Sequence, residues 1–281
     1  MNNYHYNATI KIIKIDKFYR LIRVYPDDPI KLFSPGQYGS LGLLNEEGKG
    51  LIKRPYSISS PIIDIRNKEI KNQKELNYLD FYINYVPKRK DKKEQLTPKL
   101  FKLKNNDRIF CGGKIVGHYT LPQTAINNIL FISSHSGESP NNSIINQLLL
   151  NEKSVNICNI IINQSWESPY KREHKLIAKL YSNYKCILFL DKSKNFNLIN
   201  CFIKNFLENN IFETQKVGFE FDKENILLFI CGDPILIGAP LKKGSWNYIY
   251  PDYGLINILK AFSLEVKTRF KKGQILYESY W

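Results

Sequence analysis

The segment Leu51 to Pro61, LIKRPYSISSP, is the most informative part of this sequence for both fold and ligand binding. Its β-branched and aromatic residues predict a strand over Ile52–Ser59, in which side-chain alternation sends Arg54 and Tyr56 to one face and Ser57 to the other. A strand that bends near Ser57 would still let all three side chains meet one ligand. An arginine donates paired hydrogen bonds to a phosphate, a tyrosine ring stacks on a flat heterocycle, and a serine can hydrogen-bond a ring nitrogen. These residues would suit a flavin dinucleotide, although an ordinary strand edge with an exposed arginine would look the same.

The residues around this stretch have the pattern of a β-rich domain. Short β-branched or aromatic runs recur between turn signals, and we expect strands at Ala8–Lys14, Tyr19–Tyr25, Tyr38–Leu44, Ile52–Ser59, Tyr78–Tyr85 and Asp107–Val116. Short strands at this spacing predict a small antiparallel β-barrel, with one short helix inserted near Pro98–Leu103.

The rhythm changes in the second half of the chain. Apolar runs at Asn128–Ser133, Val155–Asn163, Cys186–Leu190 and Ile226–Cys231 alternate with helix-like stretches at Pro140–Leu150, Pro169–Tyr181, Phe196–Asn209 and Asp252–Phe262. Continuous apolar strands separated by helices predict a parallel sheet that is covered on both faces. We therefore expect an antiparallel β-barrel domain at residues 1–123, followed by an α/β parallel-sheet domain at residues 124–281 whose last strand is Gln274–Trp281.

Two segments of the second half are placed to bind a nucleotide, because ligands of open parallel sheets bind outside the carboxyl ends of the strands. The small residues of Ser133–Pro140 would let backbone amides at a helix N-terminus approach a pyrophosphate. A serine-rich turn that only caps the helix explains this segment equally well. In Cys231–Pro234, Gly232 would permit the close approach of a ring, and a plain strand-to-helix turn is again the alternative.

Composition argues against several classes of protein. The five cysteines (111, 158, 186, 201 and 231) include no C-x-x-C pair and the four histidines are scattered, which argues against a metal centre or a built-in iron–sulfur cluster. No apolar run approaches the ~18–20 residues that span a bilayer. The N-terminus lacks the apolar region of a signal peptide, so we expect a cytoplasmic protein.

The formal net charge of +15 would favour an acidic partner, although biased codon usage, with lysine, asparagine and isoleucine abundant throughout, would explain the charge without one. The densest basic run, Lys88–Lys93, is expected to be a solvated loop. A positive field of this kind attracts acidic macromolecules and speeds their association. Nucleic acid and an acidic electron-carrier protein both fit, and charge alone does not choose between them.

Taken in order, several segments resemble the ferredoxin–NADP reductase family over nearly the whole chain. The similar segments are Pro35–Tyr38, Arg54–Ser57 (the family's R-x-Y-S flavin motif), Leu96–Leu103, Gly117–Leu121, Gly137–Pro140 (at the family's nicotinamide-nucleotide loop), Cys231–Gly232 and Tyr280–Trp281. Each is short, but their order and spacing make the combination specific.

The resemblance implies a bound FAD. Arg54 and Thr97 would hold its pyrophosphate, and Ser57 would hydrogen-bond the nitrogen that takes the hydride. Tyr56 would stack on one face of the isoalloxazine and Trp281 would cover the other, although a packed C-terminal tryptophan without a ligand is the alternative for Trp281. The implied FAD-binding residues are therefore Arg54, Pro55, Tyr56, Ser57, Thr97 and Trp281.

The resemblance also implies an NADP site. Cys231 would line the hydride-transfer pocket and Glu278 would relay a proton. The implied catalytic residues are Ser57, Cys231, Trp281 and Glu278, and the implied NADP-binding residues are Ser136, Gly137, Lys192, Cys231 and Gly232.

Two departures from the family pattern concern the nucleotide. The family has G-T-G before the proline of its loop, whereas here His135 and Ser136 precede Gly137, and a side chain at position 135 would crowd a pyrophosphate. The family arginine that selects the 2′-phosphate has no clear match in Phe189–Lys194. Lys192 or Lys194 would supply the charge instead, as would Lys171 or Arg172, but without the bidentate geometry of an arginine.

The family resemblance implies a flavoenzyme that transfers electrons between NADPH and an acidic carrier, ferredoxin or flavodoxin, with no nucleic-acid partner. A FAD-containing reductase component of an oxygenase system is one alternative. A non-catalytic basic binding protein on the same scaffold is another, which the altered loop and the missing arginine would favour.

Overall fold

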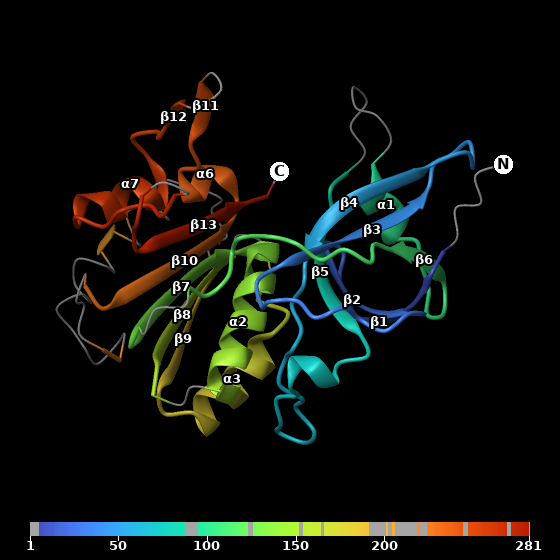
Figure 1. Ribbon diagram of the computed structural model, residues 1–281, viewed down its shortest axis with the longest axis horizontal. Coiled ribbons are helices and arrows are strands. Elements are labelled where there is room, and N and C mark those ends of the chain that lie inside the picture. The colour runs from blue at the N-terminus through green and yellow to red at the C-terminus, as the bar shows by residue number, and fades with distance from the viewer. Residues whose placement is uncertain are drawn as a thin grey trace. The chain divides into compact units, whose positions relative to one another are not determined.

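The chain forms two compact units. In the computed structural model the described residues are 6–87, 95–122, 126–151, 154–163, 166–190, 201, 204–205, 218–219, 224–243, 247–268 and 271–280. One unit comprises Met1–Leu121 with Asn142–Gln147, and the other comprises Pro122–Asn141 with Leu148–Trp281 (Figure 1). The domain boundary expected between residues 123 and 124 stays a prediction.

The first unit is built on a six-stranded antiparallel sheet in the order β4-β3-β6-β1-β2-β5. An antiparallel bridge between Ile58, just beyond β4, and Phe81 of β5 joins the two end strands and closes the sheet on itself. This confirms the predicted antiparallel barrel. Its elements are β1 (Ala8–Ile15), β2 (Tyr19–Pro26), β3 (Tyr38–Leu44), β4 (Leu51–Ser57), the 3₁₀ turn η1 (Gln73–Glu75), β5 (Leu79–Asn84), α1 (Leu96–Leu100) and β6 (Arg108–Cys111).

The core of this unit lies inside the barrel. Every second side chain of a strand points inward, as Ile10 of β1 and Phe81 of β5 do, and both are essentially inaccessible to solvent. Leu96 and Leu100, four residues apart on α1, bury the same face of that short helix in this core.

The second unit is built on a five-stranded parallel sheet in the order β13-β10-β7-β8-β9. The predicted parallel α/β domain is therefore confirmed. Its elements are β7 (Asn128–Ser134), the 3₁₀ turn η2 (His135–Gly137), α2 (Glu138–Asn151), β8 (Asn156–Asn163), α3 (Lys171–Leu180), β9 (Tyr184–Leu190), β10 (Ile226–Gly232), α6 (Pro234–Ile237), β11 (Leu241–Lys243), β12 (Asn247–Ile249), α7 (Gly254–Ala261) and β13 (Ile275–Ser279).

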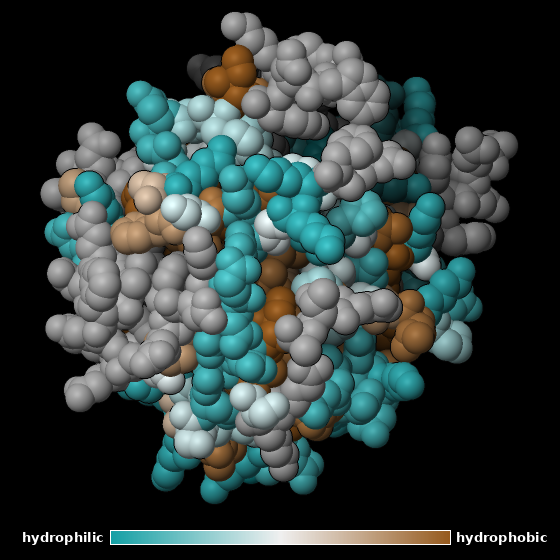
Figure 2. All heavy atoms as spheres, turned by 60° about the vertical axis from the view of Figure 1, so that its left-hand side comes forward, coloured by the Kyte–Doolittle hydropathy of each residue, from teal (hydrophilic) through white to brown (hydrophobic). Residues whose placement is uncertain are grey.

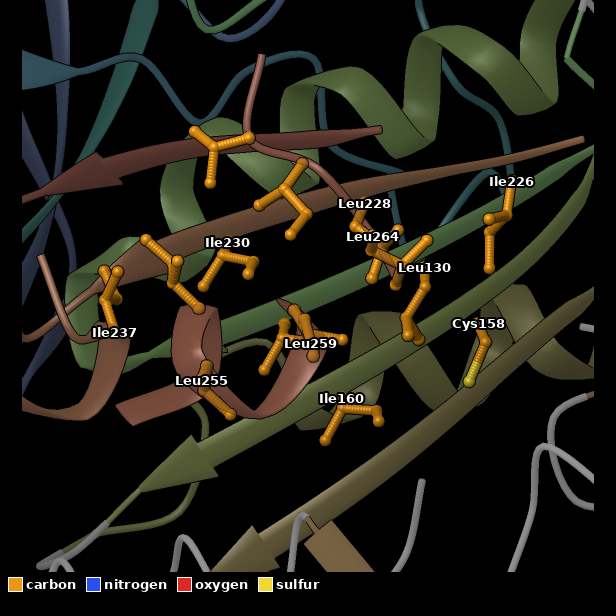
Figure 3. Close-up of a cluster of buried hydrophobic side chains, with 14 of the residues drawn as sticks. Leu130, Cys158, Ile160, Ile226, Leu228, Ile230, Ile237, Leu255, Leu259 and Leu264 are labelled. Carbon is orange, nitrogen blue, oxygen red and sulfur yellow. The ribbon is translucent and has the colours of Figure 1, made fainter. Parts of the chain in front are cut away.

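Both faces of this sheet are covered, as the continuous apolar strands predict. Every residue of β7 and of β10 is buried, so neither of the alternating faces meets water along these strands. One face packs against α6 and α7, and Figure 3 shows Leu255 and Leu259 of α7 on the same side of the sheet as Leu130.

Some expectations fall outside the described residues. The basic run Lys88–Lys93 and most of the helix expected at Phe196–Asn209 are among them. Within the part of the chain that the structure describes, no helix is long and apolar enough to span a bilayer. The coloured surface in Figure 2 is largely hydrophilic, with smaller hydrophobic areas between.

Candidate functional site

The predicted flavin motif lies on β4, a strand at one end of the sheet order. Pro55 is tolerated there because its missing N–H matters least on an end strand. Arg54 pairs with Leu41 of β3 in the strand register, and its side chain is exposed. Its Nη1 donates to the carbonyl of Lys53 at 2.8 Å, so the guanidinium lies along the strand with donors to spare for a ligand.

Tyr56 and Thr97, both predicted to bind FAD, are in direct contact. The phenol of Tyr56 hydrogen-bonds the side chain of Thr97, which α1 presents beside β4. Burial raises the pKa of Tyr56 to about 12, although this hydrogen bond and the charge of Arg54 act to lower it. The ring is therefore a neutral, half-buried aromatic surface at physiological pH, next to a hydroxyl and a cation.

Ser57 ends β4 and is buried, whereas Arg54 is exposed, as the alternation along the strand predicts. Ser57 lies opposite Tyr38 in the register. The structure thus places Arg54, Tyr56, Ser57 and Thr97 on two neighbouring elements of the first unit.

The turn Pro35–Tyr38 packs against the segment Gly117–Leu121. Gly36 has a φ of +94°, and a Cβ at this position would lie 1.9 Å from the carbonyl oxygen of Tyr119. The amide of Tyr38 donates to the carbonyl of Val116 at 2.8 Å. Only glycine fits at position 36, so two of the segments that resemble the reductase family are neighbours for a steric reason.

In the second unit, the carboxyl ends of β7, β10 and β13 bring three polar side chains into one row. Cys231 of β10 is in register with Ser133 of β7 on one side and with Glu278 of β13 on the other. The Ser133 Oγ and the Glu278 Oε2 are buried and have no hydrogen-bond partner among the described residues. Sequence reasoning named Cys231 and Glu278 as site residues but included Ser133 only as part of the segment Ser133–Pro140. The register of the parallel strands is needed to see that Ser133 lies beside Cys231.

Burial changes the protonation chemistry of this row. It raises the pKa of Glu278 to about 7, so this carboxyl can hold or release a proton near neutral pH. Burial also raises the pKa of the Cys231 thiol well above its usual range, with a further contribution from Glu278 and an opposing one from a hydrogen bond with Tyr280. Cys231 therefore stays a neutral thiol.

The loop between β7 and α2 lies against the end of β10. A Cβ on Gly137 would lie 2.1 Å from the carbonyl oxygen of Cys231, and a Cβ on Gly232 would lie 2.2 Å from the Oγ of Ser134. The Ser134 Oγ accepts a hydrogen bond from the amide of Asp233 at 2.9 Å. The absence of side chains at Gly137 and Gly232 thus allows the two segments to meet, and a larger residue at either position would separate them.

His135 does not copy the glycine of the family loop, but its backbone has a left-handed φ of +51°. Its amide donates to the Oδ1 of Asn163 at 2.9 Å, and its ring contacts that of Trp166 with centroids 4.7 Å apart. Burial lowers the pKa of His135 to about 4, against the opposing effect of Asp233. The imidazole is therefore neutral at pH 7. Ser136, the next loop residue, is partly exposed.

Three residues that the sequence assigns to FAD or NADP, Trp281, Lys192 and Lys194, lie outside the described residues. Lys171, at the start of α3, forms an ion pair with Glu167 at 2.6 Å, and Arg172 beside it is exposed.

A closed antiparallel barrel followed by a parallel α/β unit, with a glycine- and serine-containing loop at its strand ends, is the architecture of ferredoxin–NADP reductase-type proteins. No family model matches the chain. A curated relative is the flavodoxin/ferredoxin–NADP reductase of Buchnera aphidicola subsp. Baizongia pistaciae (strain Bp), which is 26% identical over 278 residues that cover 97% of this chain and 98% of the relative.

Solved structures share the fold at lower identity. A ferredoxin NADP⁺ reductase from Neisseria gonorrhoeae, with bound FAD and NADP, has a TM-score of 0.70 at 16% identity and covers 97% of both chains. The ferredoxin–NADP⁺ reductase from Plasmodium falciparum with 2′P-AMP has a TM-score of 0.64 at 19% identity, covering 98% of this chain and 96% of its own. An Amycolatopsis cytochrome P450 reductase has a TM-score of 0.61 at 15% identity, covering 97% of this chain and 68% of its own. These findings confirm the predicted resemblance to the ferredoxin–NADP reductase family.

Proposed function

We propose that this protein is a FAD-dependent oxidoreductase that transfers electrons between NADPH and a small acidic carrier, ferredoxin or flavodoxin. The observation that carries the proposal is the contact between Tyr56 and Thr97 beside the charge of Arg54, at the motif that resembles the family's flavin site. The whole-length relative named flavodoxin/ferredoxin–NADP reductase supports the same function.

The residues of the first unit have the donors and the aromatic surface that FAD requires. The exposed guanidinium of Arg54 would donate to the pyrophosphate, together with the hydroxyl of Thr97. The neutral ring of Tyr56 would pack on the isoalloxazine, and Ser57 would hydrogen-bond its edge. FAD, when bound, supplies the chemistry of accepting a hydride and releasing single electrons.

The residues of the second unit suit the nicotinamide nucleotide. Gly137 and Gly232 remove the side chains that would keep a ring or a phosphate from the backbone. The orphaned Oγ of Ser133 would find a hydrogen-bond partner in a polar ligand, since a buried hydroxyl without one is unfavourable.

Cys231 and Glu278 would have different roles in the nicotinamide pocket: Cys231 would stay protonated, whereas Glu278 would exchange a proton. A neutral thiol at Cys231 would line the pocket without competing as a nucleophile. Glu278, with its pKa of about 7, would hold or release a proton there.

The remaining assignments rest on the family resemblance. Ser136 would contribute to the nucleotide loop, and Lys192 would pair with the 2′-phosphate, with Lys194, Lys171 or Arg172 as the alternatives. Trp281 would cover the face of the flavin that Tyr56 leaves open. A cytoplasmic location is part of the same proposal.

The electron carrier is proposed from charge. A net charge of +15 favours the association of an acidic protein, and ferredoxin and flavodoxin fit this description. No nucleic-acid partner is needed to explain the charge.

Purified protein that has been supplied with FAD tests the proposal. We expect it to retain the flavin absorption and to lose it when NADPH is added under anaerobic conditions, with NADH as the parallel reductant. Reduced protein should then pass electrons to ferredoxin or flavodoxin. Failure to bind FAD would favour the non-catalytic binding protein, and transfer to an oxygenase but to neither carrier would favour the reductase component.

A further inference from the structure

A chain of hydrogen-bonded polar side chains is buried in the second unit, next to the loop His135–Gly137. The Asn159 Nδ2 donates to the Tyr184 Oη at 3.1 Å, and this oxygen lies 2.7 Å from the Nδ1 of His174. The Nε2 of His174 lies 2.8 Å from the Oε1 of Glu138, which also accepts from the Ser168 Oγ at 2.6 Å. The chain runs from β8 and β9 through α3 to the first residue of α2.

One assignment of donors and acceptors satisfies this chain. The amide nitrogen of Asn159 donates to the Tyr184 oxygen, and a carboxylate at Glu138 only accepts. With the His174 proton on Nε2, this nitrogen donates to Glu138 and Nδ1 accepts from the Tyr184 hydroxyl, which also hydrogen-bonds Cys186. The carboxylate of Glu138 thus receives two hydrogen bonds on one oxygen, from His174 and from Ser168.

Burying Glu138 and His174 removes two polar side chains from water, which costs free energy. The exposed fractions of Glu138 and His174 are 0% and 2%, and the Oε2 of Glu138 has no partner among the described residues. Apolar side chains of similar volume usually fill such a space with equal or greater stability. General stability therefore does not explain the pair, whereas the need to hold one particular local geometry does.

Glu138 is placed to fix the conformation of the loop His135–Gly137, which precedes it. Glu138 follows Gly137 directly, and Gly137 packs so closely against β10 that a Cβ on it would lie 2.1 Å from the Cys231 carbonyl oxygen. The other end of the loop, His135, contacts Trp166, which lies two residues before Ser168. The loop is thus attached at both ends to the segment that leads into α3.

We propose that Glu138 and His174 are positioning residues that hold the loop His135–Gly137 in the conformation that receives the nicotinamide nucleotide. This inference rests on the proposed function. Neither side chain needs to touch the nucleotide, since both act through the backbone of the loop. Loss of the pair should weaken nucleotide binding while leaving the bound FAD in place, because Arg54, Tyr56 and Thr97, which would hold FAD, belong to the first unit.

The test compares His174→Leu, His174→Gln and Ile177→Ala. His174→Leu removes both hydrogen bonds, whereas a glutamine amide can still donate to Glu138. Ile177 is a buried apolar residue of the same helix, so its truncation lowers stability without touching the pair. The readouts are the Kd of NADP⁺ by calorimetry, the KM and kcat with NADPH, the bound FAD and the melting temperature.

We expect His174→Leu to raise the Kd of NADP⁺ and the KM for NADPH about tenfold, which corresponds to about 1.4 kcal/mol. The kcat and the bound FAD should stay unchanged, His174→Gln should recover most of the affinity, and Ile177→Ala should leave Kd and KM at the wild-type values. Equal affinities in His174→Leu and wild type, or an equal loss in Ile177→Ala, would overturn the proposal.

A second variant keeps the test decisive if His174→Leu does not fold. Tyr184→Phe removes only the hydroxyl that hydrogen-bonds the imidazole of His174. It should therefore raise the Kd of NADP⁺ by a smaller factor than His174→Leu does, about threefold. An unchanged Kd in a folded Tyr184→Phe would then overturn the proposal. Wild-type protein that binds no NADP⁺ at all would instead contradict the proposed function, so the two failures are distinguishable.

Discussion

Burial of Glu278 has a consequence for stability that depends on pH. Its pKa rises from 4.5 to about 7 because the folded protein disfavours the charged form. The folded state therefore binds this proton more tightly than the unfolded state does. The stability that the proton provides is fully present below pH 4.5 and is lost as the pH rises to about 7. At about 1.4 kcal/mol for each pKa unit, the loss amounts to about 3 kcal/mol.

Glu278→Gln removes this titration while keeping a similar shape. The unfolding free energy of the variant minus that of the wild type should therefore increase by up to about 3 kcal/mol between pH 4.5 and about 7, and stay constant above that range. The assay is urea unfolding, followed by the fluorescence of the three tryptophans, all of which belong to the second unit. Taking the difference removes the titration of all other groups.

Glu265→Gln is the matched control, because Glu265 is exposed in the same unit. If the effect comes from the burial of Glu278, Glu265→Gln should not reproduce it. A difference for Glu278→Gln that is the same at every pH would refute the reasoning. A difference that falls as the pH rises would show that the carboxylate of Glu278 is stabilised rather than disfavoured by its surroundings.

Three further perturbations test other parts of the proposal. Arg54→Ala should raise the Kd of FAD, measured by equilibrium dialysis, about tenfold to a hundredfold, because charge-assisted hydrogen bonds of about 1.5–3 kcal/mol are lost. The control Lys53→Ala should bind FAD as the wild type does. Gly137→Ala should abolish reduction by NADPH in stopped-flow measurements, since its Cβ would lie 2.1 Å from a carbonyl oxygen, whereas Gly113→Ala, with nothing within 4 Å, should react normally. Raising the salt from about 0.1 M to about 1 M should slow association with the carrier, because the Debye length falls from about 10 Å to about 3 Å. An association rate that does not change with salt would contradict the proposal that the positive charge attracts the carrier.

The sequence predicted the sheets well because their hydrophobic patterns are strong. The strand expected at Tyr38–Leu44 has those bounds in the structure, and the runs at Asn128–Ser133 and Ile226–Cys231 each differ from β7 and β10 by a single residue. Alternation and continuous burial are properties of neighbouring residues, so they are visible in the chain itself. The hairpin of β11 and β12 was not predicted, since each of its strands has only three residues.

The arrangement of the candidate site depended on information that the sequence does not contain. Ser133 lies beside Cys231 only because of the parallel register between β7 and β10. Glu138 and His174 are 36 residues apart and meet only when α2 and α3 pack on the sheet. The raised pKa of Glu278 likewise arises from burial, which no local motif specifies.

The most direct test of the proposed flavin site is a crystal structure of the protein grown with an excess of FAD. We predict that the isoalloxazine packs on the ring of Tyr56 and that the pyrophosphate lies within hydrogen-bond distance of Arg54 and Thr97. A structure in which FAD is missing, or is bound away from β4, would contradict the proposal that this chain is a flavin-dependent reductase.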